Sequence, residues 1–131
     1  MSDDKDQMTN QIQNPKIKPR YDLEERTATF GERVIRFVKT LSQDSINNIL
    51  VDQLVRSATS VGANYMEADG AESKRDFRHK ISICKKEAKE SRHWLRMIAK
   101  ANPHLSERCR DLWREANELS LIFSAIARSS R

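Results

Sequence analysis

The sequence predicts an all-α protein, an antiparallel up-down-up-down four-helix bundle. Apolar residues recur at steps of four and three in four separate segments, and this spacing places them on one face of a helix. The segments are joined by short polar or proline-containing connections, so neighbouring helices are expected to run antiparallel. A two-helix coiled coil is the alternative, but it fits four separate apolar seams poorly.

The first 20 residues differ from the rest of the chain. They are polar, rich in Asp, Lys, Gln and Asn, and interrupted by Pro15 and Pro19. Such a segment cannot bury enough apolar surface to offset the entropy lost on ordering, so residues 1–20 are expected to be a disordered leader. The bundle then occupies residues 21–131. No apolar stretch resembles a signal peptide or a membrane span, which favours a cytoplasmic protein.

Two helices are predicted in the first half of the bundle. One begins near Asp22, a candidate N-cap, and the other runs from about Ile46 to Ala68 and ends near Gly70. The second has an apolar arc wider than one seam, which indicates packing on two sides. The first seam contains Leu23, Thr27, Phe30, Val34, Phe37 and Leu41.

The second half contains two further predicted helices. The third runs from Ser73, a candidate cap paired with Asp76, to Ala101, and Pro103 ends it. The fourth runs from about Leu105 to Arg128. Their seams contain Phe77, Ile81, Cys84, Ala88, Ser91, Leu95 and Ile98, and then Leu105, Cys109, Leu112, Ala116, Leu119, Phe123 and Ile126.

Three stretches of the sequence are similar to a known family. They are YDLEERT (21–27), QLVRSATSVGANYMEA (53–68) and the segment 81–98, which contains KEAKES (86–91) followed by Trp94 and Leu95. In combination they resemble the 23S ribosomal RNA intervening-sequence proteins, over about residues 21–127. These are four-helix-bundle proteins whose biochemical function is poorly defined. Their name refers to the location of some of their genes, inside ribosomal RNA genes, and not to an activity.

The resemblance implies an assembly and a set of partners. It implies a ring-shaped homopentamer, and the family is itself similar to the accessory variability protein of diversity-generating retroelements. That relative is a basic, barrel-shaped pentamer that binds nucleic acid and works with a reverse transcriptase. The expected partners of this chain are therefore further copies of itself, RNA or DNA, and a reverse transcriptase or another protein.

Positive charge is concentrated on the third predicted helix. The chain carries a net charge of +5, but residues 73–101 alone carry +7. Six basic side chains recur there at steps of three, four or seven, about 100° around the helix from the core seam. We call them the basic stripe: Lys74, Arg78, Lys85, Lys89, Arg92 and Arg96.

The basic stripe has two interpretations. It could follow the phosphates of a nucleic acid, or it could be a solvated face partly neutralised by acidic residues of neighbouring helices. The stripe lacks interleaved exposed aromatic residues, so any binding is expected to be electrostatic and weakly sequence-specific, without base stacking. Arg108, Arg110 and Arg114 form a separate basic set on the fourth helix.

A charged cluster is predicted between the second and third helices. A turn near residues 70–72 places Arg56 opposite about residue 86, within reach of Glu87 or Glu90. This cluster could be a functional site. The favoured interpretation is a structural ion pair that fixes the register of the two helices.

No residue pattern predicts catalysis, a metal or a cofactor. Glu90 and His93 form a single Glu-x-x-His motif, whereas di-iron bundles need two such motifs and further glutamates. Cys84 and Cys109 lie on core seams without a partner base. The predicted function is a non-catalytic homo-oligomeric scaffold that contacts RNA or DNA through phosphates. The alternative is a protein-interaction module with no nucleic-acid role.

Overall fold

The computed structural model describes residues 18–130. Residues 1–17 of the predicted leader lie outside this described part, and residues 18–20 belong to the first helix. The elements are α2 (Lys18–Val38), α3 (Ser45–Asp69), α4 (Lys74–Ala101), the short 3-10 helix η1 (Pro103–Leu105) and α5 (Ser106–Ser129).

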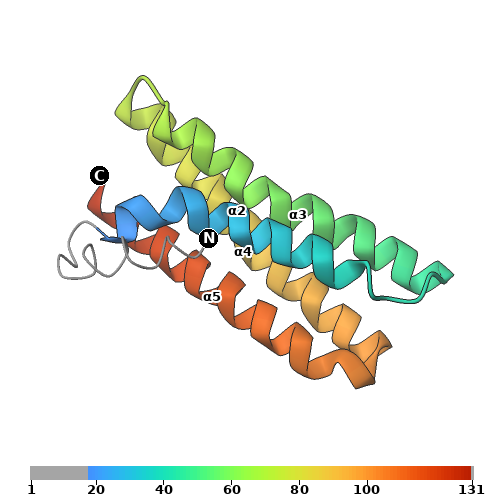
Figure 1. Cartoon of the computed structure of the whole chain (residues 1–131). Helices are drawn as coiled ribbons and strands as arrows, with labels where there is room; N and C mark the ends of the chain where they lie inside the picture. Colours follow the sequence, from blue (N-terminus) through green and yellow to red (C-terminus); the bar gives the residue numbers. More distant parts are fainter. Residues whose placement is uncertain (1–17, 131) are drawn as a thin grey trace.

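The four long helices form an antiparallel bundle. Each helix reverses the direction of the one before it, and each connection is short (Figure 1). α3 packs against α2 and α4, and α5 packs against α4 and α2. α2 therefore lies diagonally across the bundle from α4, which leaves the two helices on opposite sides. The predicted fold class is confirmed.

The four predicted seams meet in one apolar core. Nearly all seam residues are buried, and the largest fully enclosed side chains include Phe30, Phe37 and Phe123. Phe77, Leu105 and Ile126, near the helix ends, are half-buried. The predicted seams of α2, α4 and α5 are thus correct, with partial exposure only near the helix ends, while Val51, Val55 and Gly62 of the wider α3 arc are half-buried.

The wide apolar arc of α3 serves contacts within the chain. Leu54, Ala58 and Val61 are fully buried, and Val55 packs half-buried against the same core. Because α3 lies between α2 and α4, both sides of the arc are covered by helices of the same chain. The predicted packing on two sides is confirmed.

The helix boundaries follow local chemistry, with one correction. α2 begins at Lys18 rather than near Asp22, since Pro19 fits the first turn of a helix, where its missing N–H is not needed. The predicted cap of α4 is confirmed, because the Ser73 hydroxyl accepts a hydrogen bond from the Asp76 N–H at 3.0 Å. Asp44 caps α3 by accepting from the Asn47 N–H at 2.8 Å.

Two buried asparagines join the α2–α3 and α4–α5 connections at one end of the bundle. Asn47 Nδ2 donates to Asn102 Oδ1 at 3.2 Å, and Asn102 Nδ2 donates to Asn47 Oδ1 at 2.9 Å. Each amide also donates to a backbone carbonyl, of Ser42 and Ile98 respectively, at 2.9 Å. This reciprocal pair has no counterpart in the sequence-based predictions.

Candidate functional site

The basic stripe lies on the side of α4 that faces α5, and two of its six members contact α5 or the residue after it. Arg78 Nη1 donates to the Ser130 carbonyl at 3.1 Å. Arg92 hydrogen-bonds the Asn117 side chain, and its guanidinium carbon lies 5.5 Å from the centroid of the Trp113 ring. These two arginines therefore have structural contacts that a phosphate would compete with.

The other four members of the stripe remain available. Lys74, Lys89 and Arg96 are exposed and Lys85 is half-buried. Among the side chains of residues 23–130, none of the four has a carboxylate at ion-pair distance. Neutralisation by acidic residues of neighbouring helices is therefore not seen for these side chains.

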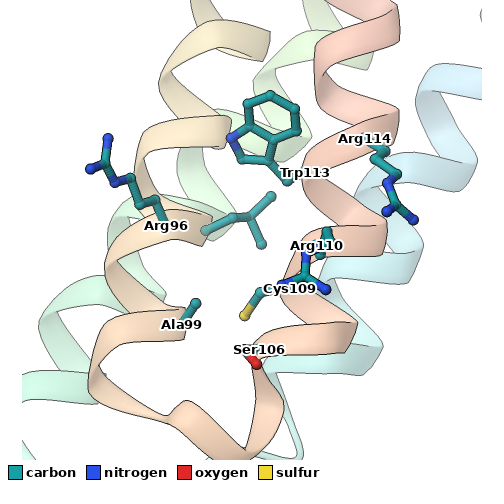
Figure 2. A pocket seen from close by; sticks show the side chains of 8 residues that line it. Arg96, Ala99, Ser106, Cys109, Arg110, Trp113 and Arg114 are labelled. Carbon is teal, nitrogen blue, oxygen red and sulfur yellow. The ribbon is translucent and has the colours of Figure 1, made fainter.

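At its C-terminal end the stripe meets a pocket between α4 and α5. The pocket has a volume of about 400 Å³. Figure 2 shows Trp113 standing between the two helices, with Arg96 on the α4 rim and Arg110 and Arg114 on the α5 rim. Its lining residues are Leu95, Arg96, Ala99, Ser106, Cys109, Arg110, Trp113 and Arg114.

This pocket corrects two expectations from the sequence. Arg110 and Arg114 are not separate from the stripe, because they line the same pocket as Arg96. An aromatic ring does lie beside the stripe, but α5 supplies it. The sequence did contain a signal for this: a turn centred near residue 103 places Trp113 opposite about residue 94, one turn or less from Arg92 and Arg96.

The opposite flank of α4 carries the charged cluster. Arg56 Nη1 lies 3.2 Å from Glu87 Oε1, and Arg56 also pairs with Glu90. Trp94 Nε1 donates to Glu90 Oε2 at 3.0 Å. The hydrogen bond from Trp94, followed by the pairing with Arg56, lowers the pKa of Glu90. The structure thus brings Arg56, Glu87 and Glu90 together in a link between α3 and α4.

The same cluster bears on the Glu-x-x-His motif. The Glu90 carboxylate already accepts hydrogen bonds from Arg56 and Trp94, and the neighbouring His93 ring packs edge-on against Trp94. Among residues 23–130, whose side chains the structure describes, no group of three or more His, Cys, Asp or Glu could hold a metal ion.

A second charged link, which the sequence analysis missed, joins α2 to α5. Arg26 Nε and Nη2 donate to the two carboxylate oxygens of Glu115 at 2.7 and 2.9 Å, and Arg26 also pairs with Glu118. The hydrogen bonds from Arg26 to Glu115 raise the pKa of the guanidinium. This planar, two-pronged pairing specifies geometry as well as charge.

Both cysteines are buried, free thiols. Burial raises the pKa of Cys84 to about 12 and that of Cys109 to about 11. Because the thiolate is the nucleophilic form, both side chains are unreactive near neutral pH and act as small core residues.

No helix in the described part of the chain combines the length and the apolar character that a bilayer crossing requires.

Comparisons with known proteins identify the family. The model of the family described as 23S rRNA-intervening sequence protein matches residues 21–125. A similar solved structure is that of a protein of unknown function from the S23 ribosomal protein family of Bacteroides thetaiotaomicron. It is 28% identical with a TM-score of 0.74, and the match covers 80% of this chain and 97% of that one. No match is found among curated proteins. The fold, the match over most of the bundle and the similar structure agree that this chain belongs to the 23S rRNA-intervening sequence protein family.

Proposed function

We propose that this protein is a non-catalytic, cytoplasmic scaffold, a homopentamer that contacts RNA or DNA phosphates through the basic stripe of α4. The observation that carries the proposal is the continuity of positive charge from α4 onto α5. Four stripe residues have no carboxylate partner among the side chains of residues 23–130, and the last of them, Arg96, shares a pocket with Arg110 and Arg114. Lysines and arginines that gain phosphate partners release counterions from the nucleic acid, which is the main source of non-specific affinity.

Self-association is supported by a groove between α2 and α3. Its volume is about 340 Å³, and two of its lining residues, Ile35 and Met66, are 41% and 56% exposed. Small residues, including Gly31, Gly62 and Ala63, line much of the remainder, and the carboxylates Glu24, Glu25 and Glu32 lie along the same groove. A second copy of the chain would cover this apolar surface. In a pentamer the basic stripe would be repeated five times, so weak contacts on each copy would add through multivalency.

The proposal can be tested by reversing charge on the stripe. The variant Lys85→Glu, Lys89→Glu, Arg96→Glu avoids Arg78 and Arg92, whose contacts with the end of the bundle and with α5 are structural. Its affinity for an oligonucleotide duplex should fall steeply. The log–log dependence of affinity on salt should flatten by about 0.9 for each phosphate that the variant no longer neutralises. Fluorescence anisotropy across a salt series measures both quantities.

A matched control is available on the opposite side of the bundle. Arg33→Glu, Arg36→Glu, Lys39→Glu changes the net charge equally on and just after α2, which lies diagonally across from α4. This variant should keep most of the binding. If both triple variants weaken binding equally, only the net charge matters and the stripe has no special role.

The second candidate function is a protein-interaction module whose partner is a reverse transcriptase or another protein. Ile46 and Ile49, at the start of α3, favour it, because they are 60% and 63% exposed. Exposed apolar side chains grouped in this way are typical of protein-binding surfaces. If the wild-type protein shows no salt-sensitive binding to RNA or DNA at low ionic strength, this candidate replaces the first.

A further inference from the structure

We propose that the pocket between α4 and α5 holds an unpaired base, so that the protein selects single-stranded over double-stranded nucleic acid. This inference rests on the proposed function, because it names the form of nucleic acid that the stripe contacts. It starts from the Trp113 ring, which is 36% exposed at the edge of the pocket. A base that stacks on an aromatic ring must first be free of its own duplex stack.

The interior of the pocket suits a flat, largely apolar ring. Leu95, Ala99 and Cys109 line its inner surface, and Leu95 and Cys109 are buried. The Cys109 sulfur and the Ser106 hydroxyl point into the space between the helices below Trp113 (Figure 2). The hydroxyl can donate to or accept from the polar edge of a base. A volume of about 400 Å³ lies within the usual range for small-molecule sites.

The arginines at the pocket rims are placed to contact the phosphate backbone of the nucleic-acid strand whose base enters the pocket. In Figure 2 the guanidinium groups of Arg96 and Arg114 point outward from opposite rims, away from the pocket floor. They are therefore placed for phosphates that flank the pocket while a base occupies it. None of the eight lining residues is acidic, and the carboxylate of the exposed Asp111 lies 3.6 Å from Arg114 near the rim.

The Trp113 ring has a fixed cationic neighbour on one face. Arg92 lies over it at 5.5 Å from the centroid, and the Asn117 side chain holds Arg92 there. This guanidinium covers one face of the ring in a cation–π contact, so a base would stack on the other face. Grooves that bind single strands combine these two elements, a basic track and an aromatic platform.

A second arginine-lined pocket, between α2 and α5, lacks an exposed aromatic ring and serves as a comparison. The pocket between α2 and α5 has a volume of about 500 Å³ and includes Arg33, Arg36 and Arg108. Its aromatic residue, Phe37, is only 2% exposed and has Arg108 over its ring at 5.0 Å. Asp111 also lines that pocket. It offers charge without an accessible ring, so no stacking is expected there.

The test compares a labelled single-stranded oligonucleotide with its duplex, using the full chain at low salt. The wild type should bind the single strand more tightly. Trp113→Leu should weaken single-strand binding about tenfold and leave duplex binding and the salt dependence unchanged. Trp113→Phe should restore most of the single-strand affinity. Trp94→Phe, on the α3 side of α4, is the matched control and should change neither.

The outcomes separate this inference from the proposed function. If Trp113→Leu weakens both ligands equally or neither, the pocket does not hold a base, while salt-dependent binding still supports the stripe. A wild-type preference for duplex also overturns the inference. If Trp113→Leu changes the oligomeric mass in light scattering, the pocket is an interface between copies and the inference is wrong. If the wild type binds neither ligand, the proposed function fails as well.

Discussion

At the scale of single residues, the most informative feature is the buried pair Asn47 and Asn102. Each side-chain amide donates to the carbonyl oxygen of the other and to one backbone carbonyl. Both residues are almost fully enclosed, with 2% and 7% exposure. A buried polar group without a partner costs more free energy than a satisfied pair contributes. The pair therefore favours one arrangement of the two connections over looser alternatives.

Replacing either asparagine should lower the free energy of unfolding. Replacing both should lower it by less than the sum of the two single effects. Asn47→Ala and Asn102→Ala are each expected to lower the free energy of unfolding by about 1–3 kcal/mol, because the remaining amide is left unsatisfied. The double variant should show clear non-additivity. Urea denaturation measures all three values.

Asn64 provides the control for this cycle. Its amide donates to Ser60 within its own helix, so Asn64→Ala should combine additively with Asn102→Ala. Additive behaviour of Asn47→Ala and Asn102→Ala would show instead that the reciprocal bonds contribute nothing to stability.

At the scale of elements, α4 separates its charges by side. Its acidic residues Glu87 and Glu90 face α3, where Arg56 pairs with both, and the basic stripe faces α5. The core seam lies between them, so three functions share one 28-residue helix. The segregation is incomplete, because Lys80 of α4 also pairs with Glu67 of α3, and Arg78 and Arg92 contact Ser130 and Asn117.

The link between α3 and α4 should make stability depend on pH on the acid side. The folded-state pKa of Glu90 lies below its ordinary value because Trp94 and Arg56 hydrogen-bond the charged form. A lowered pKa gives stability that is present above the unfolded-state pKa and is lost as the pH falls through the folded-state pKa. Trp94→Phe removes the largest cause, so the Glu90 pKa should rise.

NMR titration of the Glu90 carboxyl and unfolding experiments between about pH 6 and about pH 3 test this prediction. The Trp94→Phe variant should lose less stability than the wild type over that pH range, because its Glu90 pKa is lowered less by folding. Lys80→Gln is a suitable control, because Lys80 pairs with Glu67 elsewhere between the same two helices. An unchanged Glu90 pKa in Trp94→Phe would contradict the assignment of its cause.

At the scale of the whole molecule, the bundle presents two contrasting sides. The α4–α5 side carries the basic stripe and the Trp113 pocket, and the α2–α3 side carries the apolar groove with Ile35 and Met66. Because α2 and α4 lie diagonally opposite each other in the bundle, an assembly through the α2–α3 groove leaves the basic α4–α5 side uncovered. Oligomerisation and nucleic-acid contact are therefore compatible in this proposal.

Self-association through this groove predicts a specific change in mass. Light scattering of the wild type should give a multiple of 15.2 kDa, five times in the proposed pentamer. Ile35→Glu with Met66→Glu should reduce it toward the monomer, because it replaces the exposed apolar side chains with carboxylates in a covered groove that already contains Glu24, Glu25 and Glu32. The side chains are exposed in the protomer, so circular dichroism should show an intact fold.

The exposed pair at the start of α3 gives the control. Ile46→Glu with Ile49→Glu removes a similar apolar area away from the groove and should leave the mass unchanged. If this control disrupts the oligomer and the groove variant does not, the interface lies at the start of α3. A monomeric wild type would exclude self-association altogether.

The four helices, their seams and their order can be predicted from the amino-acid sequence alone. Apolar periodicity depends on which face of a helix is buried, and that is a local property of spacing. The buried residues Phe30, Leu95 and Phe123 follow from it, and the Ser73 cap follows from the local pairing of Ser73 with Asp76. The start of α2 was misjudged because a capping residue and a tolerated first-turn proline give competing signals.

Apart from the Arg56, Glu87 and Glu90 cluster, which the turn between α3 and α4 predicts, the side chains that share a surface are known only from the packed bundle. Asn47 and Asn102 are 55 positions apart, and Arg26 and Glu115 are 89 apart. Their pairing depends on the rotation of each helix about its axis. The same rotation brings Trp113, Arg110 and Arg114 of α5 to the end of the α4 stripe. Periodicity identifies the face that points to the core, but the flanks of neighbouring helices meet at positions set by crossing angle and axial shift, which arise only when the side chains of all four helices pack together.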